Sequence, residues 1–180
     1  MQISLNNIKK LATTYARGGM LASVFAAQAI LESGILQGGS VLANKYNNYF
    51  GIKAGNNWNG KTVAMPTQEV LNGNTVTVNA SFRVYDTPAE SFADRAALLL
   101  GLNRYKEAYT KKTPQEQAAA LQKAGYATAP SYANSIMSII YKYNLQELDK
   151  NKKDMKVLNI SAFVTAAILV CLLAVIVIKQ

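Results

Sequence analysis

Residues 25–36 read "FAAQAILESGIL", an alanine-rich apolar helix pattern that contains a single carboxylate. Helical spacing puts Glu32 on one stripe with Gln28 and Phe25, four and seven residues earlier. Apolar neighbours and the negative end of the helix dipole both raise the pKa of such a glutamate. A raised pKa suits a general acid, so Glu32 is the first candidate catalytic residue. A solvated glutamate at a helix end is the alternative.

Helical patterns also occupy most of the chain on either side. We expect helices over residues 5–16 and 20–33, with Gly18-Gly19 between them, Ser33-Gly34 as the stop and Ser23 as an N-cap. Apolar residues recur with helical spacing over three later segments, 89–109, 113–125 and 130–145. Thr113 and Pro114 are suited to be the cap and first residue of the second of these.

A hairpin interrupts the helical pattern. The stretch "TQEVLNGNTVTVNASFRVY" alternates apolar and polar residues, and Asn72-Gly73 is a strong two-residue turn signal. We therefore expect strands at residues 67–71 and 74–84. Glu69 lies on the first strand and is the second candidate catalytic carboxylate. A helix-borne acid facing a hairpin-borne carboxylate across a cleft is an arrangement that glycoside hydrolysis uses.

Composition restricts the chemistry available. The chain has no histidine, and its single cysteine is Cys171, so catalytic sites of the Ser/His/Asp and Cys/His types, Cys/His zinc sites and internal disulfides are excluded. Hydrolytic chemistry must rest on carboxylates, hydroxyls or lysine, and we expect no metal or organic cofactor. The net charge of +9 suits an anionic polymer, either nucleic acid or cell wall, or a membrane surface, and ordinary solubility is the alternative.

Residues 55–62, "GNNWNGKT", match the phosphate-binding pattern G-x-x-x-x-G-K-[ST]. That mechanism needs a following helix, whereas Val63, Pro66 and the hairpin come next, so we expect no nucleotide binding. Gly60 fits a turn instead, and Trp58 is either a core residue or a platform for sugar stacking. Tyrosines 46, 49, 126 and 132 raise the same two alternatives.

The C-terminal part differs in character. Residues 157–178 form a run of 22 residues without a charge, long enough to cross a bilayer, which predicts a transmembrane helix. A buried core helix is the alternative. The first 19 residues lack the apolar centre of a secretory signal. We therefore expect three parts: a catalytic domain at 1–147, a basic connector at 148–156 and a C-terminal, single-pass membrane anchor at 157–178.

Several ordered motifs resemble one known family. They are "SVFAAQAILESGIL", "NNYFGIKA", "TQEVLNG", "FRVYDTPAESFADRAALL" and "AGYATAPSYANSIMSIIYKYNL". Over residues 5–147 the chain is similar to glycoside hydrolase family 73, the glucosaminidases of bacterial autolysins and flagellar peptidoglycan hydrolases. The resemblance implies a lysozyme-like α+β fold, a mainly helical body with a β-hairpin lobe. It also implies cleavage of the β-1,4 bond between N-acetylglucosamine and N-acetylmuramic acid.

The resemblance also implies roles for individual residues. Glu32 occupies the position of the family's catalytic acid, Glu69 that of its second glutamate, and Tyr126 that of a tyrosine near the cleft. We expect the substrate-binding residues to be Gln28, Asn48, Phe50, Trp58 and Tyr132. One departure is Ala129, which stands where many members have an aspartate.

Alternatives stay open for mechanism and for location. The sugar cation opposite Glu32 is stabilised by Glu69 activating water, by Tyr126, or by the 2-acetamido group of the substrate. A lytic transglycosylase and a non-catalytic wall-binding or structural membrane protein are the rival functions. The partners expected are peptidoglycan and a lipid membrane, with no nucleic acid or nucleotide. Four lysines precede the span and one follows it, which predicts that the domain lies on the cytoplasmic side of the membrane. That membrane is either the bacterial inner membrane or the internal membrane of a virion that carries this bacteriolytic enzyme.

Overall fold

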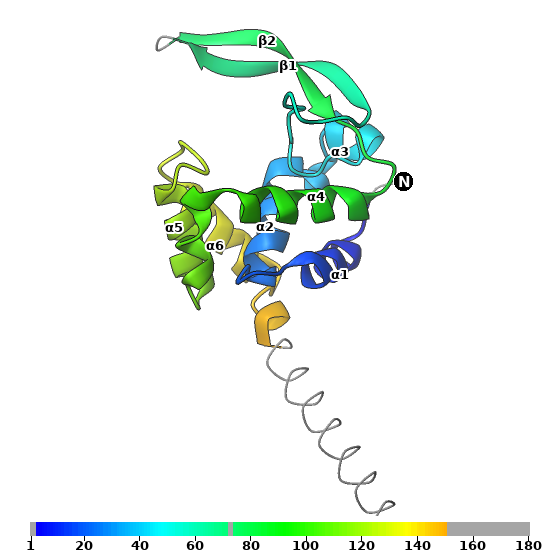
Figure 1. The fold of residues 1–180 in the computed structure, drawn as a ribbon. Coiled ribbons are helices and arrows are strands. Elements are labelled where there is room, and N and C mark those ends of the chain that lie inside the picture. The colour runs from blue at the N-terminus through cyan, green and yellow to red at the C-terminus, as the bar shows by residue number, and fades with distance from the viewer. Residues whose placement is uncertain (1–2, 72–73, 151–180) are drawn as a thin grey trace, which may run out of the picture.

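The computed structural model has a helical body with a two-stranded hairpin above it (Figure 1). It describes residues 3–71 and 74–150. In chain order the elements are α1 (Leu5–Tyr15), α2 (Ala22–Ser33), η1 (Ile35–Gln37), α3 (Val41–Tyr46), β1 (Thr62–Leu71), β2 (Asn74–Arg83), α4 (Pro88–Gly101), η2 (Asn103–Tyr105), η3 (Ala108–Thr110), α5 (Pro114–Lys123) and α6 (Tyr132–Lys142). The predicted α+β arrangement of a helical body with an inserted hairpin is confirmed.

Helix α2 lies at the centre of the body and is buried along almost its whole length. It packs against α1, α5 and α6. Its Phe25 ring lies 5.4 Å from both Phe50 and Phe92, which joins α2 to the segment after α3 and to α4. Because α2 is apolar on all sides, its position is determined by burial rather than by one amphipathic face.

Both ends of α2 are fixed by specific contacts. At its N-terminus, the Leu21 amide donates to Gln117 Oε1 at 2.9 Å and the Ser23 amide donates to Asp149 Oδ1 at 3.1 Å. The prediction of Ser23 as N-cap is therefore wrong: Leu21 holds the cap position, and Ser23 lies buried inside the first turn. At the other end Gly34 has φ +60°, a left-handed conformation that glycine adopts without strain and that ends the helix at Ser33.

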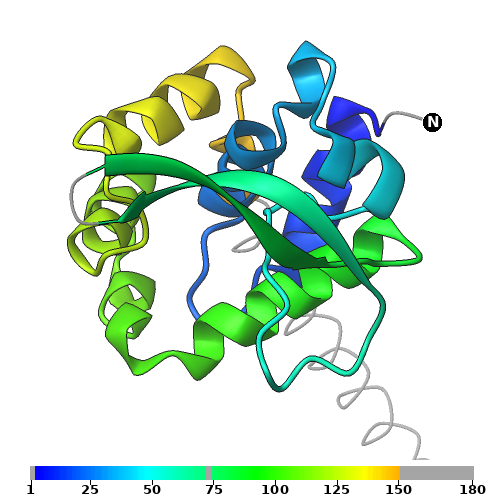
Figure 2. The ribbon, with the colours of Figure 1, turned by 90° about the horizontal axis from the view of Figure 1, so that it is seen from above.

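The hairpin crosses above the helical body, as the view from above shows (Figure 2). Its strands are antiparallel, and Thr62 pairs with Arg83 at the base. The first strand begins five residues earlier than the sequence predicts, and it includes Pro66. Proline is tolerated because each strand of a two-stranded sheet has an open edge. At the base, the Arg83 amide donates to the Ile52 carbonyl, which attaches the hairpin to the segment below it.

The remaining helices follow the sequence signals closely, with one exception. Thr113 caps α5 by accepting from the Glu116 amide, and Pro114 is the first helical residue, as predicted. The helical pattern over 89–109 does not form one helix, because α4 ends at Gly101 and two short 3-10 turns follow. These turns bring Tyr105 and Tyr109 into the core.

Within residues 3–71 and 74–150, no helix has the length and apolar character needed to cross a membrane. The predicted anchor at 157–178 and most of the predicted connector lie outside the described residues.

Candidate active site

A cleft of about 520 Å³ separates the base of the hairpin from the helical body. The body contributes Glu32 from α2, Arg95 from α4 and Tyr105 from η2, and the loop between α5 and α6 contributes Tyr126. On the hairpin side the lining residues are Ile52, Lys53, Gly55 and Arg83. The cleft therefore brings together residues from distant parts of the chain.

Glu32 lies in the last turn of α2 and faces this cleft, with 24% of its side-chain surface exposed. Burial raises the pKa of Glu32 from 4.5 to about 7, and the positive charge of Arg95 opposes part of this rise. The carboxyl group is therefore substantially protonated near neutral pH, as the apolar pattern around it predicts.

Two side chains connect to Glu32 in series. The Tyr126 hydroxyl donates to Glu32 Oε1, and Arg95 Nη2 donates to the Tyr126 hydroxyl oxygen. Arg95 Nη2 itself lies 4.0 Å from Glu32 Oε1, and Arg95 is only 4% exposed. Arg95 is not among the site residues predicted from the sequence. Its position as a lone arginine in the apolar pattern "FADRAALL" was the available signal.

Aromatic residues form the wall of the cleft around Glu32. The ring of Tyr126 lies 5.2 Å from that of Tyr132 and 6.0 Å from that of Tyr105. Gln28 is buried and donates from Nε2 to the Tyr132 hydroxyl at 2.8 Å, so its amide orients Tyr132. Phe50 also lines the cleft. Of the predicted substrate-binding residues, Phe50 and Tyr132 are thus placed at the cleft, with Gln28 directly behind Tyr132.

Asn48 lies outside the cleft lining and is buried beneath the hairpin base. Its Nδ2 donates to the carbonyl oxygens of Ile52 and Arg83, and its Oδ1 accepts from the Ile52 amide. These contacts hold the segment after α3 to the hairpin, so Asn48 supports the cleft rather than facing it. Its predicted contact with substrate stays a prediction.

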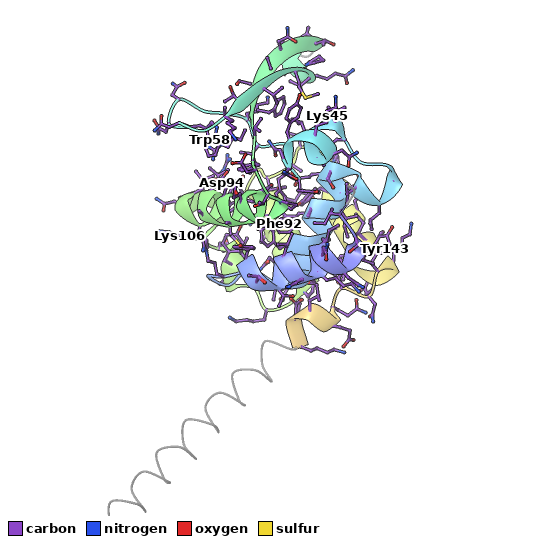
Figure 3. The ribbon with its side chains drawn as sticks, turned by 90° about the vertical axis from the view of Figure 1, so that its right-hand side faces the viewer. Lys45, Trp58, Phe92, Asp94, Lys106 and Tyr143 are labelled. Carbon is purple, nitrogen blue, oxygen red and sulfur yellow. The ribbon has the colours of Figure 1, made fainter. Side chains whose placement is uncertain are left out.

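Trp58 also lies outside the cleft lining. Figure 3 shows it at the base of the hairpin, above Asp94 of α4. The Arg83 guanidinium lies 4.5 Å from the Trp58 ring, and its Nη1 donates to both carboxylate oxygens of Asp94. The Tyr85 ring is 5.8 Å from Trp58 in an edge-on arrangement. Of the two alternatives for Trp58, these contacts favour packing at the hairpin base.

Glu69 pairs with Val76 near the end of the hairpin that is distant from Thr62 and Arg83. Its side chain lies outside the described part of the structure, so its predicted role stays a prediction. Among the described residues that line the cleft, Glu32 is the one carboxylate. Within residues 3–71 and 74–150, no three Cys, Asp or Glu side chains gather as metal ligands.

Comparison with known proteins identifies this arrangement. Residues 8–145 match the Glucosaminidase family, described as mannosyl-glycoprotein endo-beta-N-acetylglucosaminidase. The chain belongs to the glucosaminidase family. The family resemblance and the glycoside hydrolase class predicted from the sequence are thereby confirmed.

The proteins to which this domain is similar include a bacterial exo-glucosaminidase and a bacterial peptidoglycan hydrolase. It is 40% identical to the exo-glucosaminidase LytG of Bacillus subtilis over 82% of this chain and 53% of LytG. It is also 40% identical to the peptidoglycan hydrolase FlgJ of Salmonella typhimurium over 69% of this chain and 40% of FlgJ. The chain thus spans about half the length, or less, of these relatives.

Solved structures agree with this assignment. The catalytic domain of the Listeria monocytogenes autolysin Auto superimposes with a TM-score of 0.70 at 34% identity, over 81% of this chain and 85% of that one. A peptidoglycan hydrolase from Sphingomonas sp. A1 superimposes with a TM-score of 0.64 at 33% identity, over 81% and 92%. The helical body with its hairpin lobe is therefore the arrangement of this family of catalytic domains.

The raised pKa of Glu32 predicts a pH-dependent cost in stability. Between pH 4.5 and about 7 the folded state binds more protons than the unfolded state, so stability falls as pH rises through this window. Replacing Glu32 by Gln removes this cost. We expect the Glu32→Gln protein to be more stable than wild type by on the order of 2 kcal/mol above neutral pH, and equally stable near the acid end of the window.

Urea unfolding at a series of pH values measures this difference. Glu107→Gln is the matched control, because Glu107 is 72% exposed and lies outside the cleft lining. A constant difference between Glu32→Gln and wild type across the window would contradict the raised pKa.

Proposed function

We propose that this domain is a peptidoglycan hydrolase that cleaves the β-1,4 bond between N-acetylglucosamine and N-acetylmuramic acid, with Glu32 as the general acid. The observation that carries the proposal is a carboxyl with a pKa of about 7 in a cleft, hydrogen-bonded by a tyrosine. A protonated carboxylic acid at neutral pH is what donation to a glycosidic oxygen requires. The peptidoglycan hydrolases among the relatives support this substrate class.

The reaction begins when Glu32 donates its proton to the glycosidic oxygen as the bond to the sugar breaks. The sugar then carries oxocarbenium character, while Glu32 becomes a carboxylate. The Tyr126 hydroxyl already donates to Glu32 Oε1, so it stabilises this carboxylate. Tyr126 therefore acts on the acid itself. Stabilisation of the sugar is left to Glu69 or to the 2-acetamido group of the substrate.

A lytic transglycosylase is the second candidate, and one observation favours it. This mechanism needs a single acid, and Glu32 is the one carboxylate among the described residues of the cleft. The relatives also include proteins described as probable N-acetylmuramidases, so the choice of bond and the product both require a direct test.

Substitution of Glu32 tests the proposed acid. We expect Glu32→Gln to abolish clearing of purified cell walls, because the amide keeps the shape of the side chain and cannot donate the proton. Zymography and turbidity measure this, with melting of both proteins to confirm folding. Glu107→Gln should clear walls at the wild-type rate. Clearing by Glu32→Gln within a few-fold of wild type would overturn the proposal.

Substitution of Glu69 separates the two mechanisms. If Glu69 activates water, Glu69→Gln should reduce turnover strongly, by about a hundredfold or more, as for loss of a general base. Mass spectrometry of the wild-type products should then show reducing ends formed by addition of water. Unchanged activity of Glu69→Gln together with anhydro-muramic products would favour the transglycosylase.

We further propose that residues 157–178 anchor the domain in a membrane, either the bacterial inner membrane or the internal membrane of a virion. The uncharged run and the lysines before it support this. The virion alternative follows from topology, because a domain held on the cytoplasmic side of the host membrane meets the wall only when a particle delivers it.

The anchor predicts that the full chain sediments with membranes and resists extraction by carbonate, whereas a chain ending at Lys150 does not. Particles made in a host that produces the protein should release it with the detergent-soluble lipid fraction. Release of the full chain by carbonate would refute the anchor, and absence from particles would refute the virion location.

A further inference from the structure

Arg95 is a buried cation whose surroundings are defined by the catalytic cleft. Its guanidinium lies 4.6 Å from the Tyr126 ring and 5.4 Å from the Phe50 ring. Its carboxylate neighbour is Glu32, at 4.0 Å. The adjacent Asp94 is already engaged by Arg83 and by the Tyr85 hydroxyl. Burial of a guanidinium costs free energy unless its charge is paired and its N–H groups are hydrogen-bonded. Tyr126 and Glu32 are the partners that the structure shows for Arg95.

The direction of the hydrogen bonds follows from chemistry. Arginine has N–H donors and no acceptor, and it stays protonated at accessible pH. The Tyr126 oxygen must therefore accept from Arg95, which leaves its single proton for another partner. That partner is Glu32 Oε1. Without Arg95, the Tyr126 hydroxyl is free to rotate and to accept a hydrogen bond from the protonated Glu32 carboxyl instead.

We propose that Arg95 is a positioning residue that acts through Tyr126: it fixes the Tyr126 hydroxyl as a donor to Glu32 and thereby stabilises the Glu32 carboxylate that proton transfer leaves behind. This inference rests on Glu32 being the general acid. Arg95 touches neither the sugar nor the reacting oxygen in this account. Its contribution is to the charge that develops on the acid.

The other polar groups around Glu32 and Arg95 in the described part of the chain carry no charge that could stabilise the Glu32 carboxylate. Tyr132 from α6, Tyr109 from η3 and Tyr105 from η2 face the guanidinium, and burial raises the pKa of Tyr132 and Tyr109, so both remain neutral. Gln28 from α2 is uncharged and is engaged with Tyr132.

The other cations of the cleft are arranged differently. Arg83 is paired with Asp94, and the Arg104 guanidinium lies 4.7 Å from the Tyr105 ring. Arg95, in contrast, is buried and lies 4.0 Å from Glu32 Oε1. Its loss should weaken Glu32 as an acid and should change the chemical step more than substrate binding.

The test uses three variants of the full chain in detergent. Arg95→Met removes the charge and keeps an unbranched, apolar side chain. Arg95→Lys keeps the charge and loses the planar fork. Tyr126→Phe removes the hydroxyl through which Arg95 is proposed to act. The matched control is Arg17→Met, because Arg17 is exposed, follows the end of α1 and is not among the residues that line the cleft.

Reducing-end release from soluble peptidoglycan strands gives kcat and KM over a range of pH. We expect Arg95→Met to lower kcat by about ten- to a hundredfold, less than loss of a group that contacts the reacting oxygen directly. KM should stay within about twofold, and the basic limb of the kcat profile should move to higher pH, since Glu32 loses a stabilising charge. The kcat of Arg95→Lys should fall between those of Arg95→Met and wild type.

A double variant decides whether Arg95 acts through Tyr126. If it does, Arg95→Met in the Tyr126→Phe background should cost little more than Tyr126→Phe alone. The inference would be overturned if the two losses of kcat multiplied in the double variant. It would also be overturned if Arg95→Met lowered kcat without moving the basic limb of the pH profile. If Arg95→Met does not fold, the uncharged Arg95→Gln protein takes its place, since an unmoved basic limb in that variant contradicts the proposal.

The outcomes also separate this inference from the proposed function. Activity in Glu32→Gln would refute Glu32 as the acid. An inactive Glu32→Gln together with a wild-type Arg95→Met would leave the acid in place and refute only the role of Arg95.

Discussion

A glutamate held partly out of water beside one buried arginine is the constraint on which the site depends. Burial favours the protonated carboxyl of Glu32, while the positive charge of Arg95 favours the ionised form. The balance gives a pKa of about 7, so the same group is protonated before the reaction and tolerated as a carboxylate after it. Full burial of the carboxyl would prevent its ionisation, and full solvation would leave it deprotonated at neutral pH, so neither environment alone would suit a general acid.

The fold maintains this balance by fixing the helices that carry the two groups. Glu32 is at the end of α2, whose first turn is held by Gln117 and Asp149 and whose Phe25 packs against Phe50 and Phe92. Phe92 comes from α4, three residues before Arg95, so the aromatic contact that joins α2 to α4 also sets the distance between acid and arginine. The hairpin base closes the cleft from above, where Asn48 attaches it to the body.

Local sequence patterns predicted the elements but not their mutual contacts. Thr113-Pro114 and Ser33-Gly34 act within a few residues, and each marked a boundary that the structure has. The predicted turn at Asn72-Gly73 lies outside the described residues. The Ser23 cap failed because the actual partners of the α2 N-terminus, Gln117 and Asp149, are 96 and 126 residues away from the residues they bond. Tertiary contacts of this kind leave no periodic signal in the chain.

The same distinction applies to the site. Glu32 could be found from sequence because its apolar neighbours lie on its own helix, and the family motif added Tyr126. Arg95 could not be assigned, since its partners Tyr126 and Glu32 come from two other segments. Gln28 and Asn48 were predicted to bind substrate, which stays a prediction, and only the structure shows that their amides are bonded to Tyr132 and to the hairpin base.

The ionisation of Glu32 in the folded enzyme is the most direct test of this account. Carbon NMR of protein labelled at the glutamate carboxyl carbons, titrated with acid and base, reports each carboxyl separately, and the signal missing from Glu32→Gln identifies Glu32. The account predicts that this signal titrates near pH 7, well above the ordinary value of 4.5. A Glu32 signal that titrates with the exposed glutamates, near the ordinary value, would contradict it.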